Sequence, residues 1–218
     1  MAGTIVVDRI ESDASYASNI NVASQITFSN TSTFSGNLLV GTTTAQTGAK
    51  LVVTGGIQGT ITSGTSVAST SGTSIDFTGI PSWVKRITVM LSGVSPSGSS
   101  AFLLQLGTSS GVETSGYISY GAITGGATLA GGTTSTAGFI IFSNSSTNLF
   151  YGHASFTLLG SNAWVGSHVL GLNSSGGNYS VQGGGNKTTA STLDRVRITT
   201  VNGTDTFDAG NINILYEG

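Results

Sequence analysis

The side chains best suited to acid–base or metal chemistry in this 218-residue sequence are its two histidines. His153 and His168 lie in the apolar runs FYGHASF and WVGSHVLGL, which are typical of strands. Neither run holds a carboxylate, and two histidines without further ligands make a poor metal site. We therefore expect hydrogen-bonded strand histidines here, with no metal and no cofactor.

The acidic residues offer two further kinds of chemistry. Asp205 and Asp208 lie in NGTDTFDAG, where their oxygens could bind calcium, although a set of six oxygen ligands is not evident. A strand-connecting turn is the simpler interpretation, and calcium binding stays open. Glycoside cleavage needs two acids about 5–10 Å apart, but no acid falls between Thr114 and Asn186, where the aromatic residues gather. We predict that the protein is not an enzyme.

Aromatic residues beside polar loops suggest binding instead. Rings that stack on sugars, with nearby amides and hydroxyls, form a typical glycan site. Core packing is the competing interpretation for every one of these rings. The candidate glycan-binding residues are Tyr117, Tyr120, Tyr151, Trp164 and Tyr179.

One charged strand, LDRVRITTV, carries Arg195 and Arg197. Alternation places both on one face together with Leu193, and places Asp194 and Val196 on the other. Pairing with neighbouring acids is the expected role. An anionic sugar or a lipid headgroup is the alternative ligand.

The composition favours an all-β fold. Gly, Ser and Thr supply 98 of the 218 residues, and no stretch shows a helical period. Only 16 residues are charged, and the net charge of −2 gives no footprint for nucleic acid. No cysteine, signal peptide or membrane-length apolar run is visible. Few charges are available to protect the strand edges. We therefore expect the edges to be covered by closure of the sheet, by packing of sheets in a sandwich or by assembly of the chain with copies of itself.

Short apolar runs between turn clusters predict a jelly-roll-like β-sandwich from residue 76 onward. TGGATLAGGTT is interpreted as one of the turn clusters, and both prolines, Pro81 and Pro96, fall outside the predicted strands. The predicted strands are 84–92, 101–107, 116–123, 138–143, 150–160, 164–172, 193–201 and 211–216.

Two further segments precede this head domain. Residues 1–35 are predicted as an extended N-terminal attachment segment, and residues 36–75 as a short β-stalk and a Ser/Thr/Gly-rich linker. Such short strands cannot bury an apolar stripe alone, so three chains around a threefold axis would have to share one core. The residues expected to pack in this trimer or anchor are Ile20, Val22, Ile26, Phe28, Leu38, Val40, Leu51 and Val53.

LLVGTTTAQTGAKLVVTGGIQG, at residues 38–59, resembles the stalk repeat of phage tail-fibre proteins. IDFTGIPSWVKRITVMLSGVS and TLDRVRITTVNGTDTFDAGNINILYEG are similar to the terminal domain of phage virion proteins. The resemblance implies a trimeric β-stalk and a terminal head. Tail fibres usually carry many repeats, whereas this sequence holds one.

The resemblance implies a bacteriophage virion structural protein, made in the host cytoplasm and carried on the virion surface. We expect a homotrimeric short tail fibre whose head contacts the host surface. The alternative is a capsid decoration or cement protein that stabilises the phage head. Expected partners are tail or major capsid proteins and a host surface glycan, with neither nucleic acid nor membrane among them.

Overall fold

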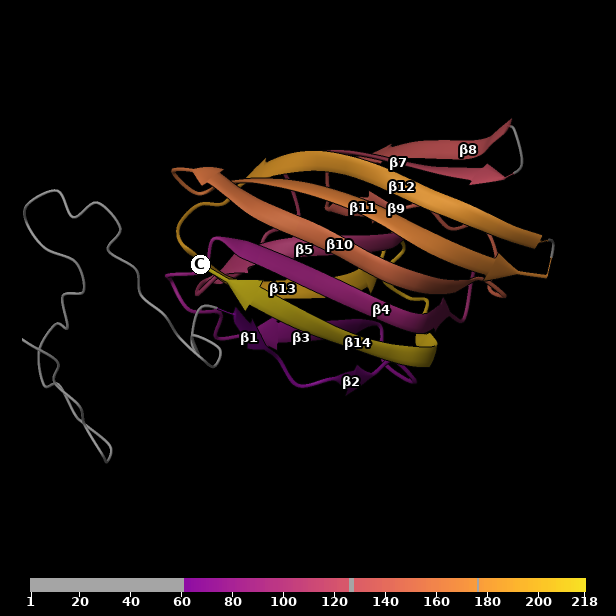
Figure 1. Cartoon of the computed structure of the whole chain (residues 1–218), viewed down its shortest axis with the longest axis horizontal. Coiled ribbons are helices and arrows are strands. Elements are labelled where there is room, and N and C mark those ends of the chain that lie inside the picture. Colours follow the sequence, from indigo (N-terminus) through magenta and orange to yellow (C-terminus); the bar gives the residue numbers. More distant parts are fainter. Residues whose placement is uncertain (1–60, 126–127, 176) are drawn as a thin grey trace, which may run out of the picture. The chain divides into compact units, whose positions relative to one another are not determined.

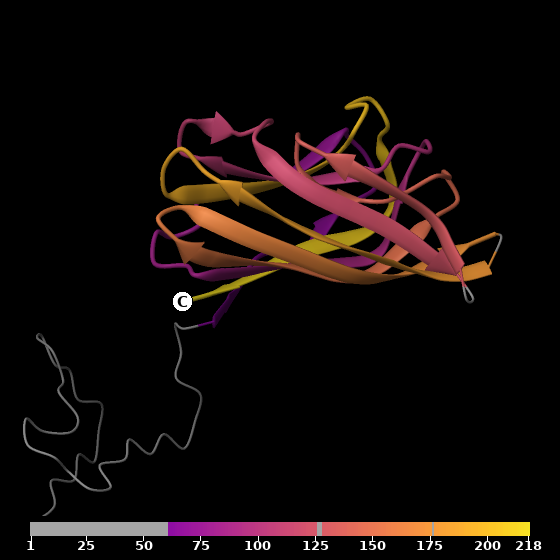
Figure 2. The same ribbon diagram turned by 90° about the horizontal axis from the view of Figure 1, so that it is seen from above.

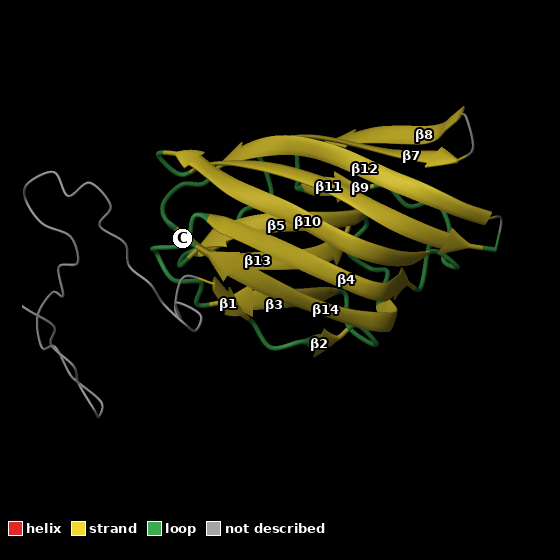
Figure 3. Ribbon diagram, viewed as in Figure 1, coloured by secondary structure: helices red, strands yellow, loops and turns green. Residues whose placement is uncertain are grey.

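The computed structural model describes residues 61–125, 128–175 and 177–218. These residues form strands joined by turns and loops, with no helix among them (Figure 3). No helix of the described part is therefore long and apolar enough to span a membrane. The all-β prediction is confirmed for this part of the chain.

The larger of two antiparallel sheets has the strand order β1-β14-β4-β10-β11-β12-β7-β8, with β2 also paired to β14 (Figure 1). Long neighbouring strands such as β10, β11 and β12 follow one another as hairpins. Its strands are β1 (Ile61–Ser63), β2 (Val67–Ala68), β4 (Arg86–Pro96), β7 (Tyr117–Gly125), β8 (Thr128–Ser135), β10 (Leu149–Gly160), β11 (Ala163–Ser174), β12 (Gly177–Thr188) and β14 (Phe207–Glu217).

The smaller sheet has the order β3-β13-β5-β6, with β9 also paired to β5. It covers one face of the larger sheet, so that the two form two layers (Figure 2). Its strands are β3 (Ser74–Thr78), β5 (Phe102–Thr108), β6 (Gly111–Val112), β9 (Phe139–Ile141) and β13 (Leu193–Thr200).

The core between the sheets follows from strand alternation. In β4, Ile87, Val89 and Leu91 are buried, whereas Thr88 and Met90 between them turn outward. Burying each large aliphatic side chain contributes about 1.5–3 kcal/mol relative to its exposure. The centre is aromatic as well, with rings in contact from both sheets: Phe102, Phe139, Phe150, Phe156 and Phe207.

All eight predicted strands occur, with ends displaced by a few residues. Two long strands were not predicted, namely β8 and β12, and both are rich in glycine. The interpretation of TGGATLAGGTT as a turn is wrong, because β8 occupies most of it. Pro96 is also not outside a strand: it is the last residue of β4, opposite Phe207, where a missing N–H is tolerated.

The predicted linker contributes strands of its own. β1 and β2 come from the tract before residue 76, and both pair with β14 at one side of the larger sheet. β3 begins at Ser74 and pairs with β13. The two-sheet structure therefore includes residues that the sequence analysis assigned to a linker.

Candidate functional site

The outer face of the larger sheet, which faces away from the smaller sheet, exposes a group of apolar side chains. Burial alternates along β7, so that Tyr117 and Ser119 point inward while Ile118 and Tyr120 point outward. The cross-strand register places outward residues of β10 and β11 on the same face. Its exposed large apolar residues include Ile118, Tyr120, Tyr151, Val165 and Val169.

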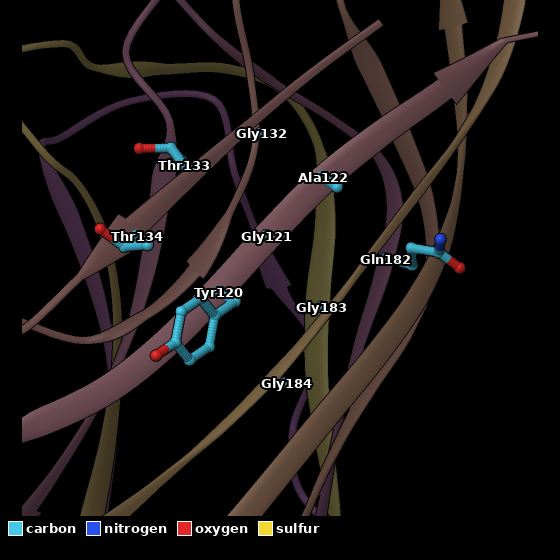
Figure 4. Close-up of a pocket in the computed structure, with 9 residues that line it drawn as sticks. All are labelled: Tyr120, Gly121, Ala122, Gly132, Thr133, Thr134, Gln182, Gly183 and Gly184. Atoms are coloured by element: carbon cyan, nitrogen blue, oxygen red, sulfur yellow. The ribbon is translucent and has the colours of Figure 1, made fainter. Parts of the chain in front are cut away.

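A shallow depression of about 470 Å³ lies on this face over β7, β8 and β12 (Figure 4). It is lined by residues 120–122 of β7, 132–134 of β8 and 182–184 of β12. The three stretches are direct neighbours in the sheet. The depression therefore belongs to the sheet itself and needs no loop to form it.

Tyr120 forms one wall of the depression. It pairs with Gly184 of β12 on one side and with Thr134 of β8 on the other, and it is 60% exposed. Because Gly184 has no side chain, nothing on β12 stands beside the ring in this row of the sheet. The tyrosine ring is thus presented to solvent from a rigid strand.

The next row supplies the floor and a polar group. Ala122 lies between Gln182 of β12 and Gly132 of β8. The two small residues keep the floor low, while the exposed Gln182 adds an amide at the opposite side from Tyr120. A ligand here would meet an aromatic ring, an amide and a threonine hydroxyl.

Glycines on the inner face allow the strands beneath the depression to pack closely. A Cβ on Gly183 would lie 2.3 Å from the carbonyl oxygen of Tyr120 and 2.4 Å from Cε1 of His168. A Cβ on Gly121 would lie 2.7 Å from the carbonyl oxygen of Ile140 in β9. Glycine is therefore required where other groups press against the underside of the sheet.

The structure separates the predicted glycan-binding residues. Tyr120 and Tyr151 are exposed on the outer face, although Tyr151 lies in β10, outside the depression. Tyr179 is partly buried against the core. Tyr117 and Trp164 are wrong candidates, because both side chains are buried in the core and neither offers a ring face to a sugar.

Tyr117 has a structural role instead. Its hydroxyl accepts a hydrogen bond from the Leu106 N–H at 2.7 Å and lies 2.9 Å from the Glu113 carbonyl oxygen, to which it donates. Burial raises the pKa of this phenol above its usual value. The ring also lies under the ammonium of Lys187, 5.2 Å from Nζ to the centroid.

The other lining residues were not identified from the sequence. Gln182, Gly184 and Thr134 reach the site only through the pairing of β8 and β12 with β7, and neither β8 nor β12 was predicted. A weak signal was available in the sequence, because residues 178–182 alternate between polar side chains and the apolar Tyr179 and Val181. Glycines 183–185 interrupt that pattern, so the rest of the strand gives no such signal.

The two histidines lie on opposite faces of the larger sheet. His153 is exposed on the outer face of β10, whereas His168 is buried on the inner face of β11. The Nε2 atom of His168 has no hydrogen-bond partner among the described residues, and burial lowers its pKa to about 4. The described residues hold no group of three His, Asp or Glu side chains that could bind a metal.

A serine-nucleophile pattern that the sequence analysis overlooked proves to be a hairpin. GTSSG at residues 107–111 matches G-x-S-x-G, which in hydrolases marks a strand-to-helix turn. Here Ser109 lies in the tight turn between antiparallel β5 and β6, with Thr108 opposite Gly111. The turn has the wrong geometry for a nucleophile elbow.

Asp205 organises a turn. Its carboxylate accepts hydrogen bonds from the Ser100 N–H at 3.0 Å and from Nδ2 of Asn202 at 2.7 Å. Asp208 is exposed in β14. The two acids thus belong to a hydrogen-bonded turn and to a strand.

Charged side chains are paired with one another away from the depression. Arg197 makes two bonds to its cross-strand neighbour Asp76, at 2.7 and 2.8 Å, which raise the pKa of the guanidinium. Arg195 pairs with Asp194. A bulge between Leu193 and Arg195 reverses the expected alternation there, so that Leu193 is buried with the core instead of lying beside the arginines.

Several predicted features fall outside the described residues. They comprise the attachment segment, most of the stalk, and the proposed packing residues Ile20, Val22, Ile26, Phe28, Leu38, Val40, Leu51 and Val53. Their arrangement stays a prediction.

Comparison with known proteins gives no relative on which to rest an assignment. No protein-family model, no curated protein and no solved structure matches the chain.

Proposed function

We propose that the protein is a bacteriophage virion structural protein, a trimeric surface projection of the short-tail-fibre type whose head contacts the host surface. The observation that carries the proposal is the outer face of the larger sheet. It exposes tyrosines and branched aliphatic residues on the long paired strands β7, β10 and β11, which hold no lysine, arginine, aspartate or glutamate. A face of this composition is typical of a surface that binds a partner.

The sequence supports the same proposal from the other end of the chain. The resemblance of residues 38–59 to a fibre-stalk repeat suits a trimeric stem, and the three chains would present three outer faces. We expect the head to be jelly-roll-like within its two antiparallel sheets. Binding suits the described residues better than catalysis does, because the exposed face gathers rings and amides without an acid–base pair.

A capsid decoration protein is the second candidate, favoured by the presence of one stalk-like repeat where tail fibres usually carry many. In that case the outer face would pack on the major capsid protein. The two placements differ in copy number, since a fibre occurs in tens of copies per particle and a decoration protein in hundreds.

The test combines quantitative mass spectrometry of purified particles with an adsorption assay. We expect tens of copies, and we expect the purified full chain to compete with particles for adsorption to host cells. Hundreds of copies without competition would favour the decoration protein. Absence from particles would refute both placements.

A further inference from the structure

We infer that the depression over β7, β8 and β12 binds one ring of a neutral saccharide, stacked against Tyr120. The inference rests on the proposed function, since it assigns the contact with the host surface to one site and one class of ligand. The site has an aromatic wall, a floor of small residues and two polar side chains, all on paired strands (Figure 4).

The aromatic wall provides the stacking surface. Sugar rings present one face of C–H groups that packs against an aromatic ring, while their hydroxyls point sideways. Tyr120 is 60% exposed, and its neighbour on β12 is Gly184, which leaves room beside the ring. Tyr151, another exposed ring of the outer face, does not line the depression and lies two strands beyond β12, in β10.

The polar side chains of the depression can form hydrogen bonds with the hydroxyls of a sugar. Its hydroxyls both donate and accept hydrogen bonds, as do the amide of Gln182 and the hydroxyl of Thr134. These residues come from the two strands that flank β7, so they stand on both sides of the floor. The volume of about 470 Å³ lies within the range of about 300–1,000 Å³ found for small-molecule sites.

Charge indicates that the saccharide is neutral. Lys187 is the only charged residue among the described residues of β7, β8, β10, β11 and β12 when lysine, arginine, aspartate and glutamate are counted. It is buried and paired with Glu113. The arginines of β13 are in the other sheet and are paired with acids. A sialic or uronic acid would therefore find no cation at this depression.

Saturation-transfer NMR on the full chain tests the assignment. The ligands are the methyl glycosides of glucose, galactose, mannose and N-acetylglucosamine, the disaccharides maltose, cellobiose and lactose, and sialic and glucuronic acid as charged controls. We expect transfer to at least one neutral ligand, strongest at its ring C–H protons, and none to the acids.

Two substitutions and one control locate the site. A Cβ on Gly132 would meet its nearest neighbours at 3.5 and 3.8 Å, which are ordinary contacts, so a side chain can be added here and Gly132→Val should occupy part of the depression. We expect this change to abolish transfer, and Tyr120→Ala to weaken binding about tenfold. Tyr151→Ala, on the same face but outside the depression, should leave binding unchanged. Circular dichroism checks that each variant is folded.

The outcomes separate this inference from the proposed function. Transfer that persists in Gly132→Val, transfer only to the acids, or no transfer to any ligand overturns the saccharide site. Binding of the same protein to host cells is measured in parallel. A chain that binds cells without binding a neutral sugar refutes the saccharide site alone, whereas a chain that binds neither also contradicts the host-contact function.

Discussion

Lys187 Nζ lies 2.6 Å from Oε2 of Glu113, and the two side chains are only 8% and 20% exposed. The ammonium also lies over the ring of Tyr117. The second carboxylate oxygen of Glu113 accepts a hydrogen bond from the Ala190 N–H at 2.8 Å. One ion pair thus joins β12, β7, the segment after β6 and the turn before β13.

Breaking this pair should destabilise the protein strongly. Lys187→Met removes the cation and leaves Glu113 largely buried without its partner, which costs about 3–5 kcal/mol in comparable pairs. We expect a loss near the lower limit, because Glu113 keeps some contact with water. Urea unfolding of the full chain measures it.

The matched control is Arg86→Met. Arg86, the first residue of β4, pairs with Glu217, the last residue of β14, and the side chain of Arg86 is 55% exposed. An exposed pair contributes less than about 1 kcal/mol. Similar losses in the two variants would contradict the importance that we assign to burial.

Tyr117→Phe isolates the hydroxyl from the ring. The phenylalanine keeps the edge contact with Phe139 but leaves the buried N–H of Leu106 without its acceptor. We expect a loss of about 1–3 kcal/mol in the free energy of unfolding. Tyr120→Phe, on the exposed face, should change it by less than about 0.5 kcal/mol. A larger loss in the free energy of unfolding for Tyr120→Phe than for Tyr117→Phe would show that the buried and exposed faces of β7 are misassigned.

The faces of β7 also show what the sequence could predict. Tyr117 and Tyr120 are three residues apart, so a strand must place them on opposite faces, and both could not belong to one exposed site. Which of them is buried depends on β9 and β12 packing above and beside the strand. Those contacts join residues far apart in the sequence and leave no periodic signal.

The fold was predictable where apolar residues alternate and was missed where glycine replaces them. β4 was recognised from Ile87, Val89 and Leu91, which mark one face. In β12, the buried face shows apolar residues only at Tyr179 and Val181, and the pattern stops where Gly183 and Gly185 occupy the next inner positions beside neighbouring groups. The depression depends on that strand, and the site could therefore not be assembled from the sequence.

Gly183→Ala tests whether these glycines are required. Its Cβ would overlap the Tyr120 carbonyl oxygen, which is backbone and cannot move without disturbing the pairing of β12 with β7. We expect destabilisation of about 1–3 kcal/mol, as for other overpacked sites. Gly132→Ala is the control, with only ordinary contacts. Thermal unfolding should show a lower Tm for the first variant alone.

The oligomeric state tests the prediction for the N-terminal segments. If Ile20, Val22, Ile26 and Phe28 share a core around a threefold axis, the full chain should sediment at three times its 21.9 kDa. Phe28→Ala should shift this equilibrium towards the monomer, and Thr27→Ala should not. A folded wild-type monomer across the micromolar range would refute the shared core.

His168 should make stability fall in acid. In the unfolded chain the imidazole of His168 has its ordinary pKa of about 6.5, whereas burial in the folded protein lowers this pKa to about 4. Between these values the unfolded state holds more protons, so the free energy of unfolding decreases as the pH falls. The loss from this group is about 3 kcal/mol in all, absent above pH 6.5 and complete below pH 4. Urea unfolding from pH 8 to pH 4 should show it in the wild type and in His153→Gln, whose imidazole is exposed. His168→Gln should flatten the profile by that amount, and an unchanged slope in this variant would show that the acid sensitivity arises from other groups.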